Sequence, residues 1–319
     1  MKKISVIVPL YNERESLEEL HRLIVKEFDA LEASGEIVFI DDGSTDGSNE
    51  VLSAIHEKSP DVKVIRFNAN SGKSAALQAG FDVAGGDYII TMDADLQDDP
   101  REIPNLVAAL DGGLDMVSGW KKRRHDPLSK TVPSKVFNSA VRFFSGLNIH
   151  DFNCGLKAYR REVVRSLSIY GELHRFIPVL AKFNGYRVGE IEVQHHPRKY
   201  GRSKYGAKRF ISGFLDLLTV ILLTRYTSKP LHLFGSVGLL FCLLGGIVNL
   251  HVVIIFIGNR FQGINGRIPY LVGGVFLFLL GIQFISTGLL AELITHSRME
   301  KTKTYHINSN NDTDSESTS

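Results

Sequence analysis

The sequence predicts an α/β domain with a mostly parallel sheet, followed by a hairpin of two membrane-spanning helices. From residue 1 to about 205, short apolar runs alternate with helical patterns, and this alternation is typical of parallel strands covered by helices. Two almost unbroken apolar runs follow, at 231–257 and 269–293. Each is long enough to cross a hydrocarbon core of ~30 Å, so we expect both to span a membrane rather than to lie in a protein core.

The expected strands of the first region are short and apolar, and turns follow them. They are 4–8, 37–40, 62–67, 88–92 and 116–119, with helices expected over 16–31, 51–55 and 74–83. In open sheets of this kind, ligands bind beyond the carboxyl ends of the strands. The turns that follow the strands therefore form the candidate binding site.

The turn after the fourth expected strand carries paired carboxylates. Asp93 and Asp95 are separated by one residue, and Gln97 lies two residues further on. Side chains alternate along an extended chain, so the two carboxylates face the same way and could share one divalent cation. Such a cation would neutralise a diphosphate. A solvated acidic turn is the alternative interpretation.

Two further polar turns reach the same edge of the sheet. Residues 8–13 read Val-Pro-Leu-Tyr-Asn-Glu, and residues 41–47 read Asp-Asp-Gly-Ser-Thr-Asp-Gly. Taken alone, each could be a turn with a helix cap, with Ser44 or Asp46 as the capping residue. Three polar strand ends that converge on one edge favour a nucleotide site.

Residues 70–74, which read Asn-Ser-Gly-Lys-Ser, resemble the end of a Walker-type phosphate-binding loop. That loop needs a glycine at position 67, where the chain has Phe67. An NTPase is therefore a poor alternative.

Basic residues cluster in two other segments. The first follows the strand at 116–119 and contains Lys121, Lys122, Arg123 and Arg124, with Lys130 and Lys135 further on; the second is 198–204, which reads Arg-Lys-Tyr-Gly-Arg-Ser-Lys. One interpretation is a solvated face that attracts anionic lipids. The other is a set of cations that binds the phosphate of a lipid acceptor.

The motifs at 8–13, 41–47, 70–73 and 93–97, in this order, resemble the inverting, sugar-nucleotide-dependent glycosyltransferases of the GT-A fold. The resemblance is to the polyprenyl-phosphate branch, which includes dolichyl-phosphate mannose synthases and bactoprenol glucosyltransferases. It covers residues 1 to about 210 and implies a Rossmann-like catalytic domain. The two-helix hairpin is similar to that of the bacterial glucosyltransferases.

The resemblance implies a role for each matching residue. On the donor side, Pro9, Tyr11 and Glu13 would line the nucleotide pocket, Asp41 would contact the base or ribose, Lys73 would lie in a donor-binding turn, and Asp93, Asp95 and Gln97 would hold Mg²⁺ or Mn²⁺ against the diphosphate. On the acceptor side, the nearest matches for binding the lipid phosphate are Lys121, Lys130, Ser134, Arg198 and Arg202.

Asp151 is the third candidate catalytic residue, beside Asp93 and Asp95. It could be a base or a positioning group, and a turn cap is equally open. A lipid phosphate has a second pKa near ~6 and is already an anionic nucleophile at neutral pH. Catalysis would therefore rest on in-line placement and on a metal that stabilises the departing nucleoside diphosphate.

The basic residues around the two apolar runs predict a topology. Those outside the hairpin are Arg225, Lys229, Arg298, Lys301 and Lys303, against Arg260 and Arg267 in the connector. The positive-inside bias then places the large domain in the cytoplasm. The expected parts are a catalytic domain over 1–207, an interfacial amphipathic helix over 208–228, a hairpin over 229–297 and a disordered tail over 298–319. A buried core helix is the alternative for 208–228.

The function that we expect is transfer of a hexose, with inversion, from a nucleotide sugar to undecaprenyl phosphate at the cytoplasmic membrane face. Glucose from UDP-glucose is the expected donor, and GDP-mannose is the runner-up. A different class is an inactive membrane scaffold or transporter, but two spans with few polar groups do not form a pathway without oligomerisation. A processive synthase would need a Gln-x-x-Arg-Trp motif, and the single tryptophan, Trp120, follows Gly119. We expect a homo-oligomer in the bilayer and no nucleic-acid partner.

Overall fold

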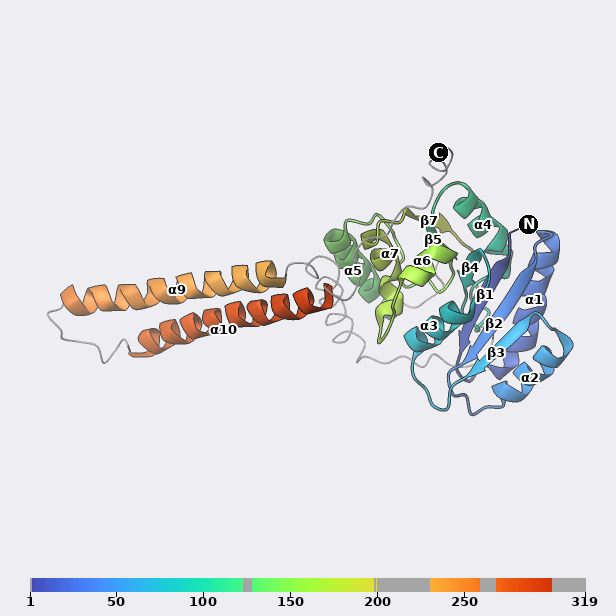
Figure 1. Ribbon diagram of the computed structural model, residues 1–319, viewed down its shortest axis with the longest axis horizontal. Helices are drawn as coiled ribbons and strands as arrows, with labels where there is room; N and C mark the ends of the chain where they lie inside the picture. The colour runs from blue at the N-terminus through green and yellow to red at the C-terminus, as the bar shows by residue number, and fades with distance from the viewer. Residues whose placement is uncertain (1, 123–127, 198, 200–229, 259–267, 300–319) are drawn as a thin grey trace, which may run out of the picture. The chain divides into compact units, whose positions relative to one another are not determined.

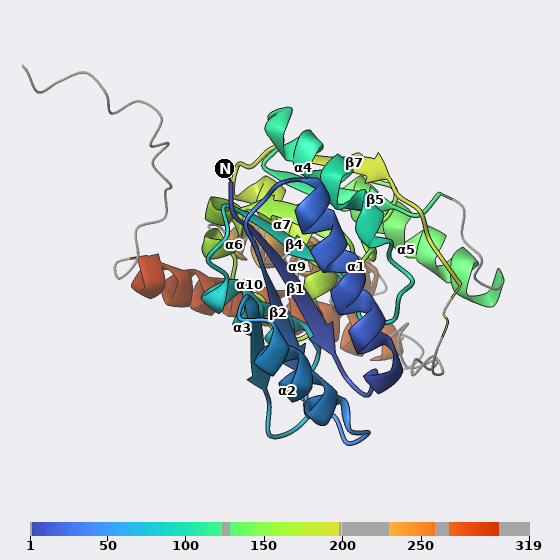
Figure 2. The same ribbon diagram turned by 90° about the vertical axis from the view of Figure 1, so that its right-hand side faces the viewer.

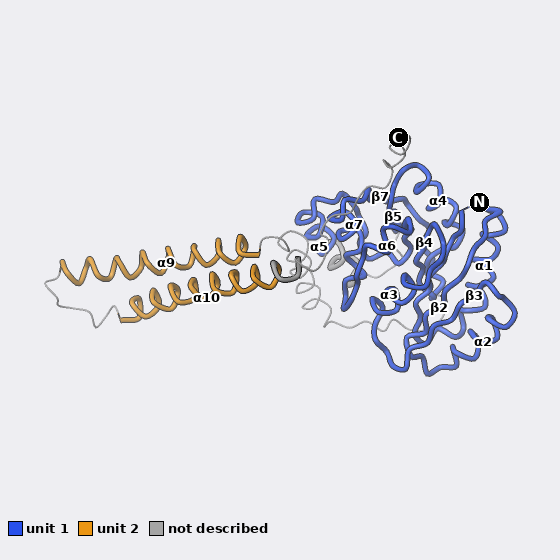
Figure 3. Tube along the Cα trace, in the orientation of Figure 1, with its two compact units in different colours: residues 1–220 blue, residues 221–319 orange. Residues whose placement is uncertain are grey.

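A computed structural model describes residues 2–122, 128–197, 199, 230–258 and 268–299 (Figure 1). The chain divides into two compact units, 1–220 and 221–319 (Figure 3). The expected interfacial helix over 208–228, the domain boundaries on either side of it and the tail from residue 300 onward lie outside the described residues. Those expectations stay predictions.

The first unit contains one seven-stranded sheet with the order β3-β2-β1-β4-β6-β5-β7. The strands are β1 (Ile4–Leu10), β2 (Gly35–Asp41), β3 (Val62–Arg66), β4 (Tyr88–Thr91), β5 (Met116–Trp120), β6 (Lys157–Arg160) and β7 (Val188–Glu192). Strand β6 pairs antiparallel with both β4 and β5, and the other pairs are parallel. The mostly parallel sheet and all five expected strands are confirmed.

Helices cover both faces of this sheet. They are α1 (Leu17–Ala30), α2 (Ser48–Lys58), α3 (Lys73–Val83), α4 (Ile103–Asp111), α5 (Leu128–Ser145), α6 (Arg161–Ser166) and α7 (Ile177–Phe183), with short 3-10 helices at Arg14–Ser16, Pro100–Glu102 and Leu173–Phe176. Helices α1 and α2 lie on one side of the strands and α3 lies on the other (Figure 1). Figure 2 shows α1 and α2 in front of the sheet.

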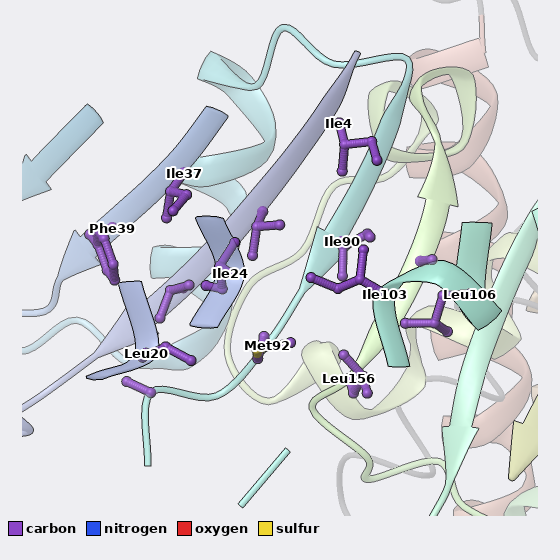
Figure 4. Packing of buried hydrophobic residues seen from close by; sticks show 14 of the residues in the cluster. Ile4, Leu20, Ile24, Ile37, Phe39, Ile90, Met92, Ile103, Leu106 and Leu156 are labelled. Atoms are coloured by element: carbon purple, nitrogen blue, oxygen red, sulfur yellow. The ribbon is translucent and has the colours of Figure 1, made fainter. Parts of the chain in front are cut away.

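The main core lies between the sheet and the helices α1, α2 and α4. Ile24 of α1 and Leu106 of α4 pack against Ile4 and Ile90 of the central strands (Figure 4). On the opposite face, α3 approaches closely at Gly80, where an added Cβ would lie 2.5 Å from Cγ2 of Ile7. The central strands are therefore buried on both faces, as parallel strands usually are, and their carboxyl ends are held in fixed positions.

The second unit consists of α9 (Pro230–Gly258) and α10 (Ile268–Met299), which pack along each other. They touch at glycines: a Cβ added at Gly238 would lie 2.6 Å from the carbonyl oxygen of Gly281, and one at Gly245 would lie 2.6 Å from that of Gly274. Most of their large apolar side chains remain exposed, as expected for helices that face lipid. Both are long and apolar enough to cross a membrane. The two expected apolar helices are confirmed, and their crossing of a membrane stays a prediction.

Candidate active site

The turns after β1 and β2 are tied to each other by hydrogen bonds. The backbone N–H of Asn12 donates to Oγ of Ser44 at 2.8 Å, and the N–H of Thr45 donates to Oδ1 of Asn12 at 2.8 Å. Asn12 has a φ of 55°, a left-handed conformation that asparagine tolerates better than most residues. The two turns that the sequence placed at the nucleotide end of the sheet therefore form one surface.

Two adjacent carboxylates at the end of β2 organise this surface. Asp41 is fully buried, and its Oδ1 accepts a hydrogen bond from the N–H of Ser44 at 2.8 Å. Asp42 accepts from the N–H groups of Ser71 and Gly72, at 2.6 Å and 3.0 Å. Asp42 thus fixes the turn that precedes α3. Asp41 was among the residues predicted from the sequence and Asp42 was not, although the two aspartates are adjacent.

Asp93 and Lys73 form an ion pair at the centre of the carboxyl edge. Lys73 begins α3, and Asp93 follows β4, so the packing of α3 on the sheet brings them together. Burial acts to raise the pKa of Asp93, but the nearby charges of Lys73 and Lys121 outweigh it and lower this pKa to about 2. Asp93 is therefore a carboxylate at neutral pH, with a cation already beside it.

The rest of the acidic turn is held by hydrogen bonds. Asp95 is buried, and its Oδ1 accepts from the N–H of Gln97 at 3.2 Å. The side-chain amide of Gln97 donates to the carbonyl oxygen of His196 at 3.4 Å, which ties the turn to the segment after β7. Leu96 between them has a φ of 59°. The turn is thus shaped before any ligand binds.

The donor set of this turn suits a hard divalent cation. Among the described residues, no group of three or more His, Cys, Asp or Glu side chains is arranged as a complete metal site. Asp93 and Asp95 supply two carboxylates, and Mg²⁺ is commonly bound by one or two carboxylates together with substrate phosphates. The residues therefore fit such an ion once a diphosphate is present, with Gln97 as a ligand remaining a prediction.

A second ion pair lies beside the first. The carboxylate of Asp98 is almost completely buried and lies 2.7 Å from Nζ of Lys121. Burial alone would lower the pKa of Lys121, but Asp98 and the other negative groups nearby raise it above its usual value. Lys121 is therefore charged and already paired with a carboxylate. Its contact with an acceptor phosphate stays a prediction.

Asp151 is buried, and its Oδ1 accepts from the N–H of Asn153 at 3.1 Å. This bond is a cap on the turn at 151–153, which is one of the two roles that the sequence left open. Its role as a base or positioning group stays a prediction.

The structure describes only some of the remaining predicted residues. Pro9 lies in β1, and Tyr11 and Glu13 lie in the turn after it, partly exposed, at the edge that carries Asp41. Lys130 and Ser134 lie on helix α5, but their side chains are outside the described residues. Arg198 and Arg202 are also outside the described residues.

A narrow pocket next to Asp93 is lined by Lys73, which the sequence had already indicated, and by three basic residues that were not among those predicted. These are Lys157, His174 and Arg175. Burial lowers the pKa of Lys157, and burial together with Lys73 lowers the pKa of His174 well below its usual value. Lys157, His174 and Arg175 lie outside the recognised motifs, and no local sequence pattern marks them.

Comparisons with known proteins show the family to which the chain belongs. Residues 5–168 match the family model described as Glycosyl transferase family 2. The dodecaprenyl-phosphate galacturonate synthase of Rhizobium johnstonii is 36% identical over 302 residues, which cover 92% of this chain and 88% of the relative. The undecaprenyl-phosphate 4-deoxy-4-formamido-L-arabinose transferase of Salmonella choleraesuis is 38% identical over 295 residues, with the same two coverages, 92% and 88%.

Solved structures support the fold. Glucosyl-3-phosphoglycerate synthase from Mycobacterium tuberculosis, in complex with phosphoglyceric acid, superposes with a TM-score of 0.54 at 20% identity and covers 70% of this chain and 80% of that chain. The same enzyme with Mn²⁺, UDP-glucose and phosphoglyceric acid also gives 0.54 at 20% identity, with coverages of 68% and 80%. At this identity the likeness shows the fold alone. With its GT-A-type domain and its full-length relatives, the chain belongs to glycosyl transferase family 2.

Proposed function

We propose that this protein transfers one sugar from a nucleoside diphosphate donor to a polyprenyl phosphate at the cytoplasmic face of a membrane, with inversion and with the help of Mg²⁺ or Mn²⁺. The observation that carries the proposal is the pair Asp93 and Asp95 at the carboxyl edge of the sheet, with Lys73 beside it. The two full-length relatives, which are named as polyprenyl-phosphate sugar transferases, support the acceptor class.

The reaction needs little proton chemistry. An oxygen of the lipid phosphate attacks the anomeric carbon of the donor sugar, the bond from that carbon to the diphosphate breaks, and the nucleoside diphosphate leaves with the electron pair. A divalent ion would stabilise the charge that develops on the departing diphosphate. Asp93 and Asp95 would hold that ion, and Lys73, paired with Asp93 in the free protein, would move its charge toward the diphosphate.

The donor sugar is the open part of the proposal. Glucose from UDP-glucose was the expectation from the sequence, with GDP-mannose as the runner-up, and both stay predictions. The relatives' names add galacturonate and formamido-arabinose as candidates. The membrane hairpin would keep the catalytic domain at the lipid surface, and the excess of basic residues outside the hairpin supports a cytoplasmic domain.

The test is transfer by the purified full-length protein in detergent, with undecaprenyl phosphate as acceptor and a panel of nucleotide sugars as donors. We expect a lipid-linked sugar and free nucleoside diphosphate in equal amounts, and loss of both in EDTA. Donor hydrolysis without lipid product would contradict transfer to the lipid, and no reaction with any donor would contradict the proposal and favour the inactive scaffold.

The acceptor side has its own test in Arg202, one of the basic residues before the hairpin. If Arg202 binds the lipid phosphate, Arg202→Ala should lower acceptor kcat/KM by about tenfold to a hundredfold, with the donor KM unchanged. Arg202→Lys is the control: a bulk electrostatic attraction would be insensitive to it and would weaken smoothly with salt. If acceptor kinetics are unchanged in Arg202→Ala, Arg202 does not bind the lipid phosphate, and attraction to the membrane surface is the role that remains for it.

A further inference from the structure

The pocket beside Asp93 concentrates buried positive charge. The side chains of Lys157 and Arg175 are both less than a tenth exposed, and both line the pocket together with Lys73. Placing an ammonium or guanidinium group away from water is costly unless an opposite charge or several hydrogen bonds compensate for it. The arrangement therefore raises the question of which anion these cations bind.

The carboxylates around the pocket are already engaged elsewhere. Asp93 pairs with Lys73, and Asp151 caps its own turn. Glu172 pairs with Arg175 through Nη2 at 2.6 Å, but its side chain is 44% exposed, so this bridge is weak and easily exchanged. Asp93 and Asp151 act to raise the pKa of Lys157, but burial outweighs them, and among the described residues no carboxylate forms an ion pair with Lys157.

Hydrogen-bonding capacity remains inside the pocket. Within the described part of the chain, the ammonium of Lys157 donates to the carbonyl oxygen of Cys154, which uses one of its three donors. Nε of Arg175 is buried and has no hydrogen-bond partner among the described residues, and the same is true of Oδ1 of Asn153. Two buried cations with unused donors and one unused acceptor line the same pocket.

The pocket adjoins the place where the transferred sugar would lie. Gly155 lines it, and a Cβ added at Gly155 would lie 2.5 Å from Oδ2 of Asp93. If Asp93 and Asp95 hold the diphosphate through a metal ion, the sugar attached to that diphosphate extends next to Asp93. Of the groups on a sugar, only an acidic one would use the charges of both Lys157 and Arg175.

We propose that this pocket binds the carboxylate of the donor sugar, so that the preferred donor is a nucleotide-linked uronic acid rather than a neutral hexose. Arg175 and Lys157 would bind the carboxylate, and Asn153 would accept a hydrogen bond from a ring hydroxyl. This inference rests on the proposed function. A phosphate on a polyprenyl chain is the other source of an anion, and a raised acceptor KM in variants of the pocket would identify it.

The test compares donors that differ only at C6. Full-length protein in detergent is assayed with UDP-galacturonate against UDP-galactose, and with UDP-glucuronate against UDP-glucose. We expect at least one acid to exceed its neutral partner by tenfold or more in kcat/KM. Equal use of acid and neutral sugar would overturn the inference while leaving the proposed function intact, whereas no transfer from any donor would contradict the proposed function.

Variants then assign the preference to the pocket. Arg175→Gln should lower kcat/KM for the acidic donor by about tenfold to a hundredfold and should leave the neutral donor within about twofold, so the preference collapses. Arg165→Gln, at an exposed position on α6, is the matched control and should behave like wild type. An equal loss for both donors would overturn the inference, and a raised acceptor KM in that case would assign the pocket to the lipid phosphate.

Binding provides a measurement that does not depend on turnover. Calorimetry without acceptor should give tighter binding of UDP-galacturonate than of UDP-galactose, or of UDP-glucuronate than of UDP-glucose, and Arg175→Gln should abolish the difference. Lys157→Met is a second variant with the same expectation, and its melting temperature shows whether it folds. Equal affinities of the wild-type protein for acid and neutral donors would contradict the inference even if no transfer is seen.

Discussion

The two halves of the sheet's carboxyl edge hold their carboxylates in different ways. In the half built from β1, β2 and β3, buried carboxylates accept hydrogen bonds from backbone N–H groups: Asp41 from Ser44, and Asp42 from Ser71 and Gly72. In the half built from β4, β5 and β6, two carboxylates instead pair with lysines, Asp93 with Lys73 and Asp98 with Lys121.

This difference separates two tasks. A carboxylate that accepts from the backbone fixes the shape of a loop, and it cannot leave without exposing buried N–H groups. A carboxylate that is paired with a flexible lysine can exchange its partner when a ligand brings new charge. The first half therefore shapes a pocket, and the second half responds to charged ligands. Substitutions in the first half should therefore mainly lower stability, and substitutions in the second half should mainly lower activity or donor binding.

The largest effect is expected at Asp93. Asp93→Asn removes the negative charge that would hold the metal ion and that now faces Lys73, so transfer should fall by about a thousandfold or more while the melting temperature changes little. Asp82→Asn, on α3 with a hydrogen bond to Gln78, is the control and should keep full activity. Measured turnover and thermal unfolding decide the point, and full activity in Asp93→Asn or in EDTA would remove the metal site from the proposal.

Lys73 should give the next largest effect. Lys73→Ala leaves Asp93 without its present partner and removes a cation from the diphosphate side, so the donor KM should rise by about tenfold to a hundredfold. The acceptor KM should stay within about twofold. Initial rates with each substrate varied in turn give both constants, and equal changes in the two would argue against a donor-side role for Lys73.

Asp42 tests the other half of the edge. Asp42→Ala leaves the N–H groups of Ser71 and Gly72 without their acceptor, and we expect a loss of about 1–3 kcal/mol in stability together with a moderately raised donor KM. Asp42→Asn keeps one carbonyl acceptor and should lose less. Thermal unfolding and donor kinetics check this expectation. A variant that keeps its melting temperature would mean that the turn does not depend on these bonds.

The smallest effect on activity is expected at Glu36, which lies at the amino end of β2 and therefore away from both halves. Burial acts to raise its pKa, but hydrogen bonds from Ser5, Gly85 and Lys63 lower it from 4.5 to about 2. A carboxylate with a lowered pKa in the folded state stabilises the fold above its unfolded pKa and loses this effect as the pH falls.

Glu36→Gln should therefore lower the melting temperature at neutral pH, by an amount equivalent to about 1–3 kcal/mol, and should leave transfer unchanged. The gap between wild type and variant should close as the pH falls from about 4.5 toward about 2. Unfolding curves across this pH range test whether the stability difference between wild type and variant shrinks as the pH falls. A gap that stays constant would show that the charge of Glu36 does not carry the stabilisation.

Much of this protein is determined by local sequence. The runs at 231–257 and 269–293 are apolar along most of their length, and a helix that satisfies its own backbone is the direct consequence in lipid. The strands at 4–8 and 88–92 and the acidic turn with Asp93 and Asp95 are equally local patterns, so their positions and their common edge followed from periodicity and parallel pairing.

Other features were decided only by the tertiary structure. Strand β6 enters the sheet antiparallel between β4 and β5, and this places Lys157 beside Asp93. The helix region that contains Arg175 closes the same pocket from another part of the chain. Asp42 likewise has its partners 29 and 30 residues away. Contacts of this kind depend on which elements pack together. The local sequence around a single lysine, arginine or aspartate does not predict its distant partner.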